Sequence, residues 1–320
     1  MSRLTVLVTS IYQPEHLAGL RAAFPDVRFV QLSQDGAVPA EGTKAEVLLR
    51  CYMSKSSLRR ALTEAPGIKW IHTCTAGFDQ LLIPEILERS LRVTRSANTQ
   101  NVPMAEFVIG YLFLVSKRFP EALRSQAKHE WQPPDPDELG GKTIGVVGAG
   151  AVGVEVARRC AALGMRVVGT KRTPAPLPHF DRVMPPDGLP ALLAESDFVL
   201  LAVPLTAETQ GMIAEAQLRM MKPTAWLINV ARGALIVEGD LIRALRERWI
   251  TGACLDAFVQ EPLPPESPLW DLDNLILTPH SSYRSPLGMP RGLEEFKANL
   301  RRYLDGEPLA NPLKDPVLGY

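Results

Sequence analysis

Short apolar runs alternate with amphipathic segments along most of the chain. Such runs predict buried strands, because a parallel strand is covered on both faces and needs no polar side. In the first third of the chain they lie at residues 4–9, 27–32, 45–50, 69–73 and 91–94. Between them, residues 15–24 and 56–65 carry apolar side chains at helical spacing and predict helices. This alternation predicts an α/β domain with a mainly parallel sheet.

The best-defined stretch follows an apolar strand predicted over residues 143–147. Gly148, Gly150 and Gly153 form a Gly-x-Gly-x-x-Gly turn, and a helix over residues 154–164 and a second strand over residues 166–170 come next. In a dinucleotide-binding fold these glycines allow a tight turn, let the backbone approach a pyrophosphate, and let helix and strand pack closely. The amides and partial positive charge of the helix N-terminus would bind the phosphates. The alternative is a glycine turn with a structural role alone.

The same patterns predict further strands and helices on both sides of this turn. Further strands are predicted at residues 198–203, 226–230, 252–256 and 274–278. Further helices are predicted at residues 103–116, 120–129, 189–194, 214–220, 238–247 and 291–304. We expect the last helix to return to the first domain, so that the chain crosses between two domains near residues 98 and 286.

Composition argues against several classes of protein. The 320 residues carry a formal net charge of zero, which gives no reason to expect a nucleic acid or an anionic membrane as partner. No apolar run approaches the ~18 residues of a membrane span, and the chain enters a strand at once, so we expect no signal peptide. The four cysteines are scattered without metal or redox spacing, which predicts reduced thiols in the cytoplasm and no metal site.

Several separated motifs occur in a fixed order along the chain. They are Ala76-Gly77-Phe78-Asp79, Ala105-Glu106-Phe107, the glycine turn, Val203-Pro204-Leu205-Thr206, Asn229-Val230-Ala231-Arg232-Gly233, Leu255-Asp256-Ala257-Phe258-Val259-Gln260-Glu261-Pro262 and Leu277-Thr278-Pro279-His280. Together they resemble the D-2-hydroxyacid dehydrogenases over nearly the whole chain. The resemblance implies a flavodoxin-like substrate domain of residues 1–98 and 287–320, and a Rossmann dinucleotide-binding domain of residues 99–286.

Three side chains near predicted strand ends suit the reduction of a 2-keto acid, which the resemblance implies. The guanidinium of Arg232 can bind a carboxylate with two parallel hydrogen bonds and contact the adjacent keto oxygen. His280 can donate a proton as hydride arrives at C2, and the resemblance implies that Glu261 hydrogen-bonds and orients it. The alternatives are a surface arginine and a structural histidine. The other histidines are expected to be surface or structural residues: His16, His72, His129 and His179.

Other residues are assigned to the substrate less directly. The resemblance implies that backbone amides at Ala76 and Gly77 help bind the substrate carboxylate, with a plain strand-to-helix turn as the alternative. Arg50 ends a predicted strand and either contacts substrate or faces solvent. Tyr283 and Arg284 stand where the family usually has a small residue or glycine, and they either narrow the substrate pocket or cap the terminal helix.

Most cofactor contacts beyond the glycine turn are implied by the resemblance. Asp256 matches the aspartate that binds the nicotinamide carboxamide, with a turn aspartate as the alternative. Pro204 and Thr206 match the segment that lines the adenosine side. The full set of predicted cofactor residues is Gly148, Ala149, Gly150, Ala151, Val152, Gly153, Lys171, Arg172, Val203, Pro204, Thr206, Val230, Ala231, Asp256 and Ser282.

The end of the second strand of the dinucleotide domain predicts which cofactor is preferred. NAD enzymes of this fold place Asp or Glu there, about 20 residues after the turn, to bind the ribose hydroxyls. Here Lys171 and Arg172 occupy that place. A cationic pair attracts a 2′-phosphate, so we predict NADP(H) as the preferred cofactor and NAD(H) as a second one. The alternative is a solvated basic pair beside a tolerant NAD site.

Within the family, this cationic segment is most similar to the glyoxylate/hydroxypyruvate reductases, and such a reductase is the leading interpretation. The rival is a dinucleotide-sensing protein without turnover, similar to the transcriptional corepressors of the family. The resemblance also implies a homodimer formed through the cofactor domain. The apolar helix at residues 103–116 either supplies that surface or is buried within one chain.

Overall fold

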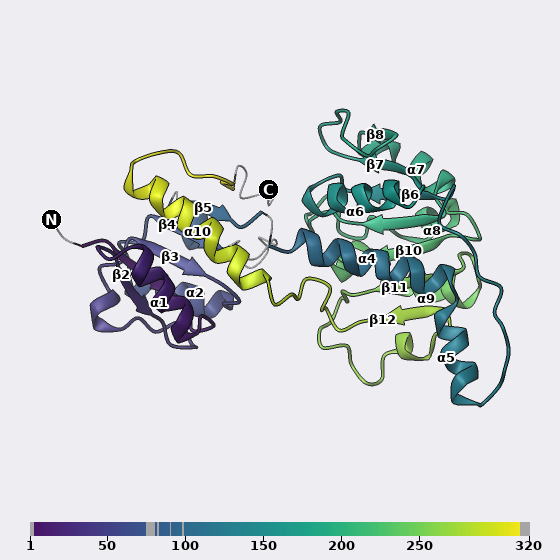
Figure 1. The fold of residues 1–320 in the computed structure, drawn as a ribbon, viewed down its shortest axis with the longest axis horizontal. Helices are drawn as coiled ribbons and strands as arrows, with labels where there is room; N and C mark the ends of the chain where they lie inside the picture. Colours follow the sequence, from purple (N-terminus) through teal and green to yellow (C-terminus); the bar gives the residue numbers. More distant parts are fainter. Residues whose placement is uncertain (1–2, 75–80, 82, 90, 98, 314–320) are drawn as a thin grey trace. The chain divides into compact units, whose positions relative to one another are not determined.

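Two parallel sheets from different parts of the chain organise the protein (Figure 1). This computed structural model describes residues 3–313 except 75–80, 82, 90 and 98. The chain separates into two compact units. The first unit comprises Met1–Gln100 and Ser285–Tyr320, and the second unit is Asn101–Arg284.

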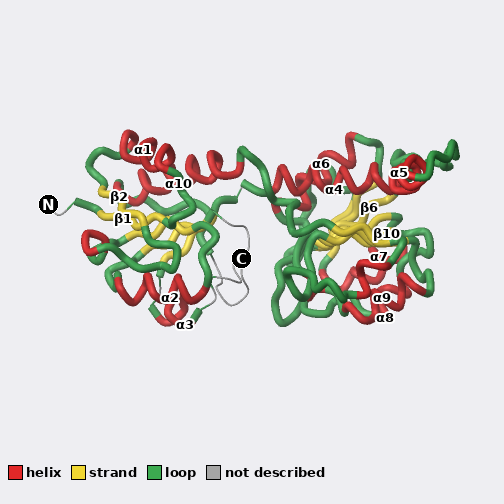
Figure 2. Tube along the Cα trace, turned by 90° about the horizontal axis from the view of Figure 1, so that it is seen from below, coloured by secondary structure: helices red, strands yellow, loops and turns green. Residues whose placement is uncertain are grey.

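The first unit contains a five-stranded sheet in the order β2-β1-β3-β4-β5, with parallel pairing throughout. Its strands are β1 (Thr5–Val8), β2 (Arg28–Gln31), β3 (Val47–Arg50), β4 (Trp70–Thr73) and β5 (Arg92–Arg95). Its helices are α1 (Pro14–Ala23), η1 (Ala40–Gly42), α2 (Lys55–Glu64), α3 (Pro84–Glu88) and α10 (Gly288–Leu304). Figure 2 shows α1 and α10 on one face of the sheet and α2 and α3 on the other.

Alternate side chains of the strands supply two apolar layers in this unit. Val6 and Val8 of β1 belong to the same buried cluster as Phe296 of α10. Leu7, which points to the opposite face, belongs to the cluster that contains Leu58 of α2. Burying one such side chain is worth about 1.5–3 kcal/mol, so these two layers hold the helices against the sheet.

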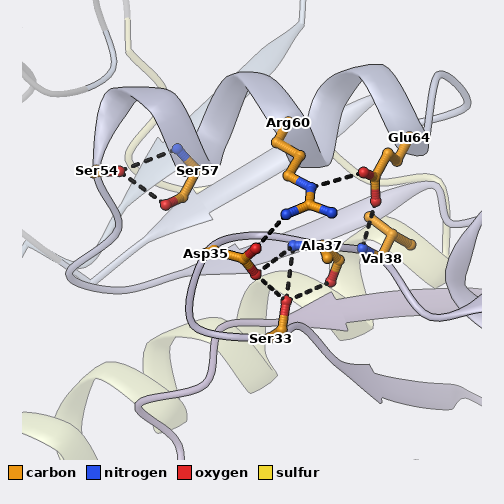
Figure 3. A network of polar contacts seen from close by, with 8 residues as sticks. All are labelled: Ser33, Asp35, Ala37, Val38, Ser54, Ser57, Arg60 and Glu64. Atoms are coloured by element: carbon orange, nitrogen blue, oxygen red, sulfur yellow. Dashed lines mark hydrogen bonds and ion pairs between the residues drawn. The ribbon is translucent and has the colours of Figure 1, made fainter.

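A surface network connects the segment after β2 to α2 (Figure 3). The guanidinium of Arg60 contacts the carboxylate of Asp35 and donates to Oε1 of Glu64 at 2.8 Å. The other carboxylate oxygen of Glu64 accepts from the backbone N–H of Val38 at 2.7 Å. These side chains are largely exposed, so the network orders the segment while the apolar layers supply most of the stability.

The second unit contains a seven-stranded parallel sheet in the order β12-β11-β10-β9-β6-β7-β8. Its strands are β6 (Thr143–Val147), β7 (Arg166–Thr170), β8 (Arg182–Met184), β9 (Phe198–Leu201), β10 (Trp226–Asn229), β11 (Gly252–Leu255) and β12 (Leu275–Leu277). Its α-helices are α4 (Asn101–Ser116), α5 (Phe119–Ala127), α6 (Ala151–Ala162), α7 (Leu189–Glu195), α8 (Glu215–Met220) and α9 (Glu238–Arg246). Short 3₁₀ turns η2 (Pro186–Gly188), η3 (Gly233–Leu235) and η4 (Pro268–Asp271) complete it.

Helices cover both faces of this second sheet. Val146 of β6 joins the cluster formed with α4 and α6, while Val147 joins the cluster formed with α7, α8 and α9. The strand order reverses between β6 and β9, which are neighbours in space. Ligands of such sheets bind beyond the carboxyl ends of the strands at this point. The fold therefore places the glycine turn, which follows β6, at the expected ligand-binding edge.

The fold class predicted from the sequence is confirmed, with a mainly parallel sheet in each unit. The strands expected at residues 143–147 and 166–170 have those bounds in the structure. Besides the 3₁₀ turns, two short elements were not predicted. β8 has three residues, of which Arg182 is exposed, so no apolar run marks it, and α3 has five. Among the described helices, none is both long and apolar enough to cross a membrane.

Candidate active site

The glycine turn connects the carboxyl end of β6 to α6. Gly148 has a φ of +104°, and a Cβ there would lie 2.7 Å from the carbonyl oxygen of Ala202. A Cβ on Gly153 would lie 2.4 Å from the carbonyl oxygen of Gly148, so the helix approaches the strand closely only with glycine here. A Cβ on Gly150 would meet nothing within 4 Å, which leaves that side of the turn open to a ligand.

The first turn of α6 carries amides that can bind a phosphate. Ala151 and Val152 are its first residues after the N-cap Gly150, and the first amides of a helix have no partner within the helix. Ala149 differs, because its N–H donates to the carbonyl oxygen of Thr170 at 2.8 Å. Ala149 thus fastens the turn to β7, while the amides of the first helical turn are the better phosphate donors.

Both predicted cations lie directly after β7. Lys171 is half-buried, and its backbone N–H donates to the carbonyl oxygen of Met184 in β8 at 2.9 Å. Nη2 of Arg172 lies 3.2 Å from Oε2 of Glu208, an exposed carboxylate in the segment after β9. Strand β8 therefore fixes the basic segment, and Glu208 partly neutralises it.

The segment after β9 packs against the glycine turn. Cγ1 of Val203 would lie 2.8 Å from a Cβ added to Gly148. The N–H of Thr206 donates to Oγ1 of Thr209 at 2.8 Å, and that hydroxyl donates to the carbonyl oxygen of Pro204 at 2.7 Å. A local hydrogen-bonded turn therefore holds these predicted cofactor residues beside the end of β6.

Asp256 follows β11 and is fully buried. Its Oδ1 accepts from Oγ1 of Thr278 at 2.6 Å and from the N–H of Ser281 at 2.9 Å, and its Oδ2 accepts from the N–H of Ser282 at 2.9 Å. Since Thr278 gives its hydroxyl proton to Asp256, Tyr111 of α4 donates to Thr278, at 2.5 Å. Burial also raises the pKa of Tyr111 and keeps it a donor. The carboxylate therefore organises the turn after β12.

His280 lies on that turn in an unusual backbone conformation. Its φ of +48° falls in the left-handed region, which is uncommon for a residue other than glycine. Nδ1 of the ring lies 2.7 Å from Oε2 of Glu261, and the other oxygen of Glu261 accepts from the N–H of Phe258 at 2.9 Å. The His280 side chain is 30% exposed, so its imidazole is held by a carboxylate without being sealed in the core.

Arg232 lies after β10, and β11 separates β10 from β12 in the sheet. The buried Asn229 shapes its loop by accepting from the N–H of Ala231 at 3.0 Å and donating to the carbonyl oxygen of Arg232 at 2.9 Å. A Cβ on Gly233 would lie 2.0 Å from the carbonyl carbon of Phe258. The arginine loop therefore packs directly on the segment after β11, whose carboxylate holds the histidine.

Arg50 of the first unit is 1% exposed, so the alternative that it faces solvent is wrong. Its guanidinium donates to Oγ1 of Thr73 at 3.2 Å and to the carbonyl oxygen of Met53 at 2.7 Å. These bonds join the carboxyl ends of β3 and β4. The two other predicted substrate residues, Ala76 and Gly77, lie outside the described residues.

Residues 109–282 match the family described as "D-isomer specific 2-hydroxyacid dehydrogenase, NAD binding domain". The chain belongs to the D-isomer-specific 2-hydroxyacid dehydrogenases. This dehydrogenase is 38% identical over 284 residues to a glyoxylate reductase of Thermofilum pendens, with 82% of each chain covered. It is 35% identical over 265 residues to a glyoxylate reductase of Korarchaeum cryptofilum, with 79% of this chain and 78% of that relative covered.

Solved structures extend the likeness to the whole chain. A D-isomer specific 2-hydroxyacid dehydrogenase from Xanthobacter autotrophicus, in complex with NADPH and MES, has a TM-score of 0.88 and 31% identity over 100% of both chains. An NADPH-dependent glyoxylate/hydroxypyruvate reductase from Sinorhizobium meliloti, in complex with NADP and sulfate, has a TM-score of 0.85 and 27% identity, covering 99% of this chain and 100% of that one. The protein is an NAD(P)-dependent dehydrogenase, as the resemblance implied.

The second unit of this dehydrogenase fits a dinucleotide. The hydroxyl of Ser282 is buried, and among the described residues it has no hydrogen-bond partner. Buried hydroxyls are normally paired, so a ligand is a suitable source of the partner. The open side of Gly150 and the amides at the start of α6 suit a pyrophosphate. These features are consistent with the predicted cofactor set.

Sequence reasoning missed several residues that position the dehydrogenase site. Asn229 is a polar residue at the end of an otherwise apolar buried strand, and that placement was a usable signal. Thr278 carries a weaker signal, because it stands two residues before the histidine in a conspicuous motif. Glu208 carries none, because its contact with Arg172 joins residues from two different strand-end segments.

Proposed function

We propose that this dehydrogenase reduces glyoxylate, hydroxypyruvate and similar small 2-keto acids, with D specificity at C2 and NADPH as the preferred reductant. The observation that carries the proposal is the 2.7 Å contact between Nδ1 of His280 and Oε2 of Glu261, on segments that pack with the Arg232 loop. The relatives named as glyoxylate reductases support the substrate class and do not favour a dinucleotide sensor without turnover.

In this proposal Arg232 binds the substrate carboxylate with paired hydrogen bonds and polarises the neighbouring keto group. His280 donates a proton to the keto oxygen from Nε2, because Glu261 engages Nδ1. Glu261 holds the Nδ1 edge of the ring and so selects Nε2 as the nitrogen that faces the substrate. His280 acts at the moment of hydride transfer, so its loss lowers turnover more than binding. Arg232 also holds the substrate, so its loss is expected to raise KM and to lower kcat together.

We assign the cofactor to the edge of the second unit. The dinucleotide, when bound, supplies the hydride that reaches C2 of the substrate. The chain's own groups bind and orient it. The pyrophosphate is assigned to Gly148, Ala149, Gly150, Ala151, Val152 and Gly153, the adenosine side to Val203, Pro204 and Thr206, and the nicotinamide side to Val230, Ala231, Asp256 and Ser282.

The preference for NADPH is assigned to Lys171 and Arg172 at the end of β7. A guanidinium binds a phosphate with directed hydrogen bonds, and an ammonium adds a mobile positive charge. Steady-state kinetics with both cofactors tests this assignment. We expect a higher kcat/KM for NADPH than for NADH. A higher value for NADH would refute the assigned role of Lys171 and Arg172.

The first unit is proposed as the substrate domain. Arg50 and the backbone amides of Ala76 and Gly77 are its proposed substrate contacts. The burial of Arg50 favours a fixed guanidinium over a mobile surface one. Arg50→Lys is expected to raise KM for the keto acid while the dissociation constant of NADPH stays unchanged. An unchanged KM would remove Arg50 from the substrate site.

We also propose a homodimer formed through α4, α5 and the segment that follows. Phe119 and Leu123 of α5 are 51% and 60% exposed, and Trp131 is 98% exposed. Phe119 and Leu123 are four residues apart on α5 and therefore share one face of the helix, and an exposed apolar face is typical of an interaction surface. Light scattering is expected to give a molecular mass twice that of one chain. The double variant Trp131→Ser with Leu123→Ser is expected to have the mass of a single chain. A monomeric wild-type protein would refute the dimer.

A cytoplasmic location is proposed from cysteine chemistry. All four cysteines are free and buried, which suits a compartment that keeps thiols reduced. Fractionation of cells that produce the native protein tests this proposal. Recovery with a periplasmic or secreted marker would contradict it.

The test of the proposed function is NADPH oxidation with glyoxylate, hydroxypyruvate, pyruvate and phenylpyruvate in turn. We expect the highest kcat/KM with glyoxylate or hydroxypyruvate, and D-glycerate as the product from hydroxypyruvate. NADPH binding without turnover of any of these acids would favour the dinucleotide-sensing rival. A preference for phenylpyruvate would contradict the proposed substrate class.

A further inference from the structure

Tyr283 contacts the imidazole of His280 edge-to-face. The two ring centroids are 5.7 Å apart and the ring planes meet at 85°. Tyr283 is half-buried. Aromatic rings attract each other in this edge-to-face geometry, because the positive edge of one ring meets the negative face of the other. The residue that departs from the family pattern is therefore in direct contact with the proposed proton donor.

The turn that carries both rings is held at several points. The N–H of His280 donates to the carbonyl oxygen of Thr278 at 2.9 Å. The N–H groups of the next two residues, Ser281 and Ser282, donate to the buried carboxylate of Asp256. The backbone is thus fixed from the histidine up to the residue before Tyr283, and the two rings meet on a rigid frame.

One hydrogen bond does not fix the orientation of an imidazole. The bond from Nδ1 to Glu261 sets the position of one ring edge and leaves the ring free to tilt about the bond. A second ring packed nearly perpendicular against it restricts that tilt. We propose that Tyr283 is a positioning residue that sets the orientation of His280, so that Nε2 is aimed at the keto oxygen. This inference rests on the proposed function.

The structure argues against one of the two roles left open by the sequence, that of a cap for the terminal helix. Leu287 occupies the N-cap position of α10, and its N–H donates to Oγ of Ser285 at 3.1 Å. The start of α10 therefore uses groups after Tyr283. The other role, narrowing of the substrate pocket, predicts a different kinetic result and is decided by the test below.

The test compares Tyr283→Ala with Tyr283→Phe, which keeps the ring, and with Arg246→Ala, an exposed residue of α9 outside the proposed site that serves as the control. For glyoxylate reduction with NADPH, we expect Tyr283→Ala to lower kcat about ten- to a hundredfold, because a small misplacement of a catalytic group is costly. KM and the NADPH dissociation constant stay close to wild type, Tyr283→Phe keeps the wild-type kcat, and Arg246→Ala leaves kcat unchanged. If Tyr283→Ala fails to fold, Tyr283→Leu replaces it.

A second readout needs neither cofactor nor turnover. Nitrogen-15 NMR of the free protein follows the exchange of the His280 ring proton that faces Glu261. We expect faster exchange with solvent in Tyr283→Ala and wild-type exchange in Tyr283→Phe. Unchanged exchange together with unchanged kcat would overturn the inference, as would a change confined to KM or improved use of phenylpyruvate. A wild-type enzyme inactive on every keto acid would refute the proposed function, while the exchange rates would still decide the role of Tyr283.

Discussion

Each unit of the protein contains a histidine on or just beyond a sheet strand, and the two differ in almost every physical respect. His72 of β4 is fully buried, with Nδ1 at 2.8 Å from Oγ1 of Thr94 and Nε2 at 3.0 Å from Oγ of Ser96. Burial lowers the pKa of His72 to about 3, so its ring is neutral. His280 is partly exposed, and its Nδ1 meets the carboxylate of Glu261 at 2.7 Å.

The role of each histidine therefore depends on its hydrogen-bond partner and on whether a ligand can reach the ring. Its position relative to a strand does not decide that role. A buried imidazole bonded to hydroxyls pays a desolvation penalty when it takes up a proton, so His72 serves the stability of the sheet. An imidazole beside a carboxylate at an open sheet edge can change protonation state during a reaction. The same side chain is structural in the first unit and a proposed acid in the second.

The largest expected effect comes from the same substitution at both histidines. His280→Gln is expected to lower kcat for glyoxylate reduction about a thousandfold, because the proton donor is lost. His72→Gln is expected to lower the free energy of unfolding by about 1–3 kcal/mol through its altered hydrogen bonds, with normal kcat per folded molecule. Steady-state kinetics and urea unfolding of both variants measure these effects.

The two substitutions control for each other, since each removes one imidazole and adds one amide. NADPH titration should show that His280→Gln still binds the cofactor. Full turnover by His280→Gln would refute the role of His280 as the proton donor. A large loss of kcat in well-folded His72→Gln would refute the purely structural role of His72.

Glu261→Gln is expected to have the next largest effect, a loss of about ten- to a hundredfold in kcat. The amide keeps the shape of the carboxylate and its contact with the N–H of Phe258, while it removes the charge beside Nδ1 of His280. KM for NADPH should stay unchanged. A kcat equal to that of the wild type would show that the pair does not act in turnover.

The buried histidine predicts a specific dependence of stability on acid pH. The folded-state pKa of His72 is about 3, whereas its ordinary value is 6.5, so the unfolded chain binds the proton first as pH falls. The stability linked to His72 is therefore complete above pH 6.5 and is lost progressively as pH falls toward 3. The loss is about 1.4 kcal/mol per pH unit in that window. Urea unfolding at several pH values between 3 and 6.5 measures this effect. The free energy of unfolding should fall more steeply with falling pH in the wild type than in His72→Gln, and equal pH dependences would refute this linkage.

The smallest expected effect concerns Glu208, which contacts Arg172 at 3.2 Å. In our proposal this carboxylate competes with the 2′-phosphate of NADPH for the guanidinium. Exposed pairs of this kind are worth about 0.2–1 kcal/mol, so Glu208→Gln should lower KM for NADPH by less than about fivefold. KM for NADH should not change. An equal change for both cofactors would place Glu208 outside the 2′-phosphate site.

Much of the fold could be predicted because local patterns determine it. Strands β6 and β7 were predicted residue for residue, since each is a short apolar run that a glycine precedes closely. Strand β8 was missed, because its three residues include the exposed Arg182 and it depends on pairing with β7. Sequence patterns alone do not reveal a strand that forms mainly because it pairs with a neighbouring strand.

The candidate site was predictable to a different extent. The family resemblance implied the roles of Arg232, Glu261 and His280, and predicted strand ends supported those of Arg232 and His280. The structure shows the contact between His280 and Glu261. The hydrogen bonds from Asp256 to the turn after β12 could not be predicted, because they join residues far apart in sequence. The contact between Tyr283 and His280 was not predicted either. The histidine that makes it has a left-handed backbone conformation, and no local sequence pattern indicated that conformation.

The most direct test of the central claim is a crystal structure of the protein with NADP and oxamate, an unreactive analogue of a small 2-keto acid. We expect the carboxylate of oxamate to make paired hydrogen bonds with Arg232. We also expect Nε2 of His280 to lie about 3 Å from the amide oxygen that stands for the keto oxygen. Oxamate bound beside the nicotinamide but away from both side chains would refute the proposed roles of Arg232 and His280.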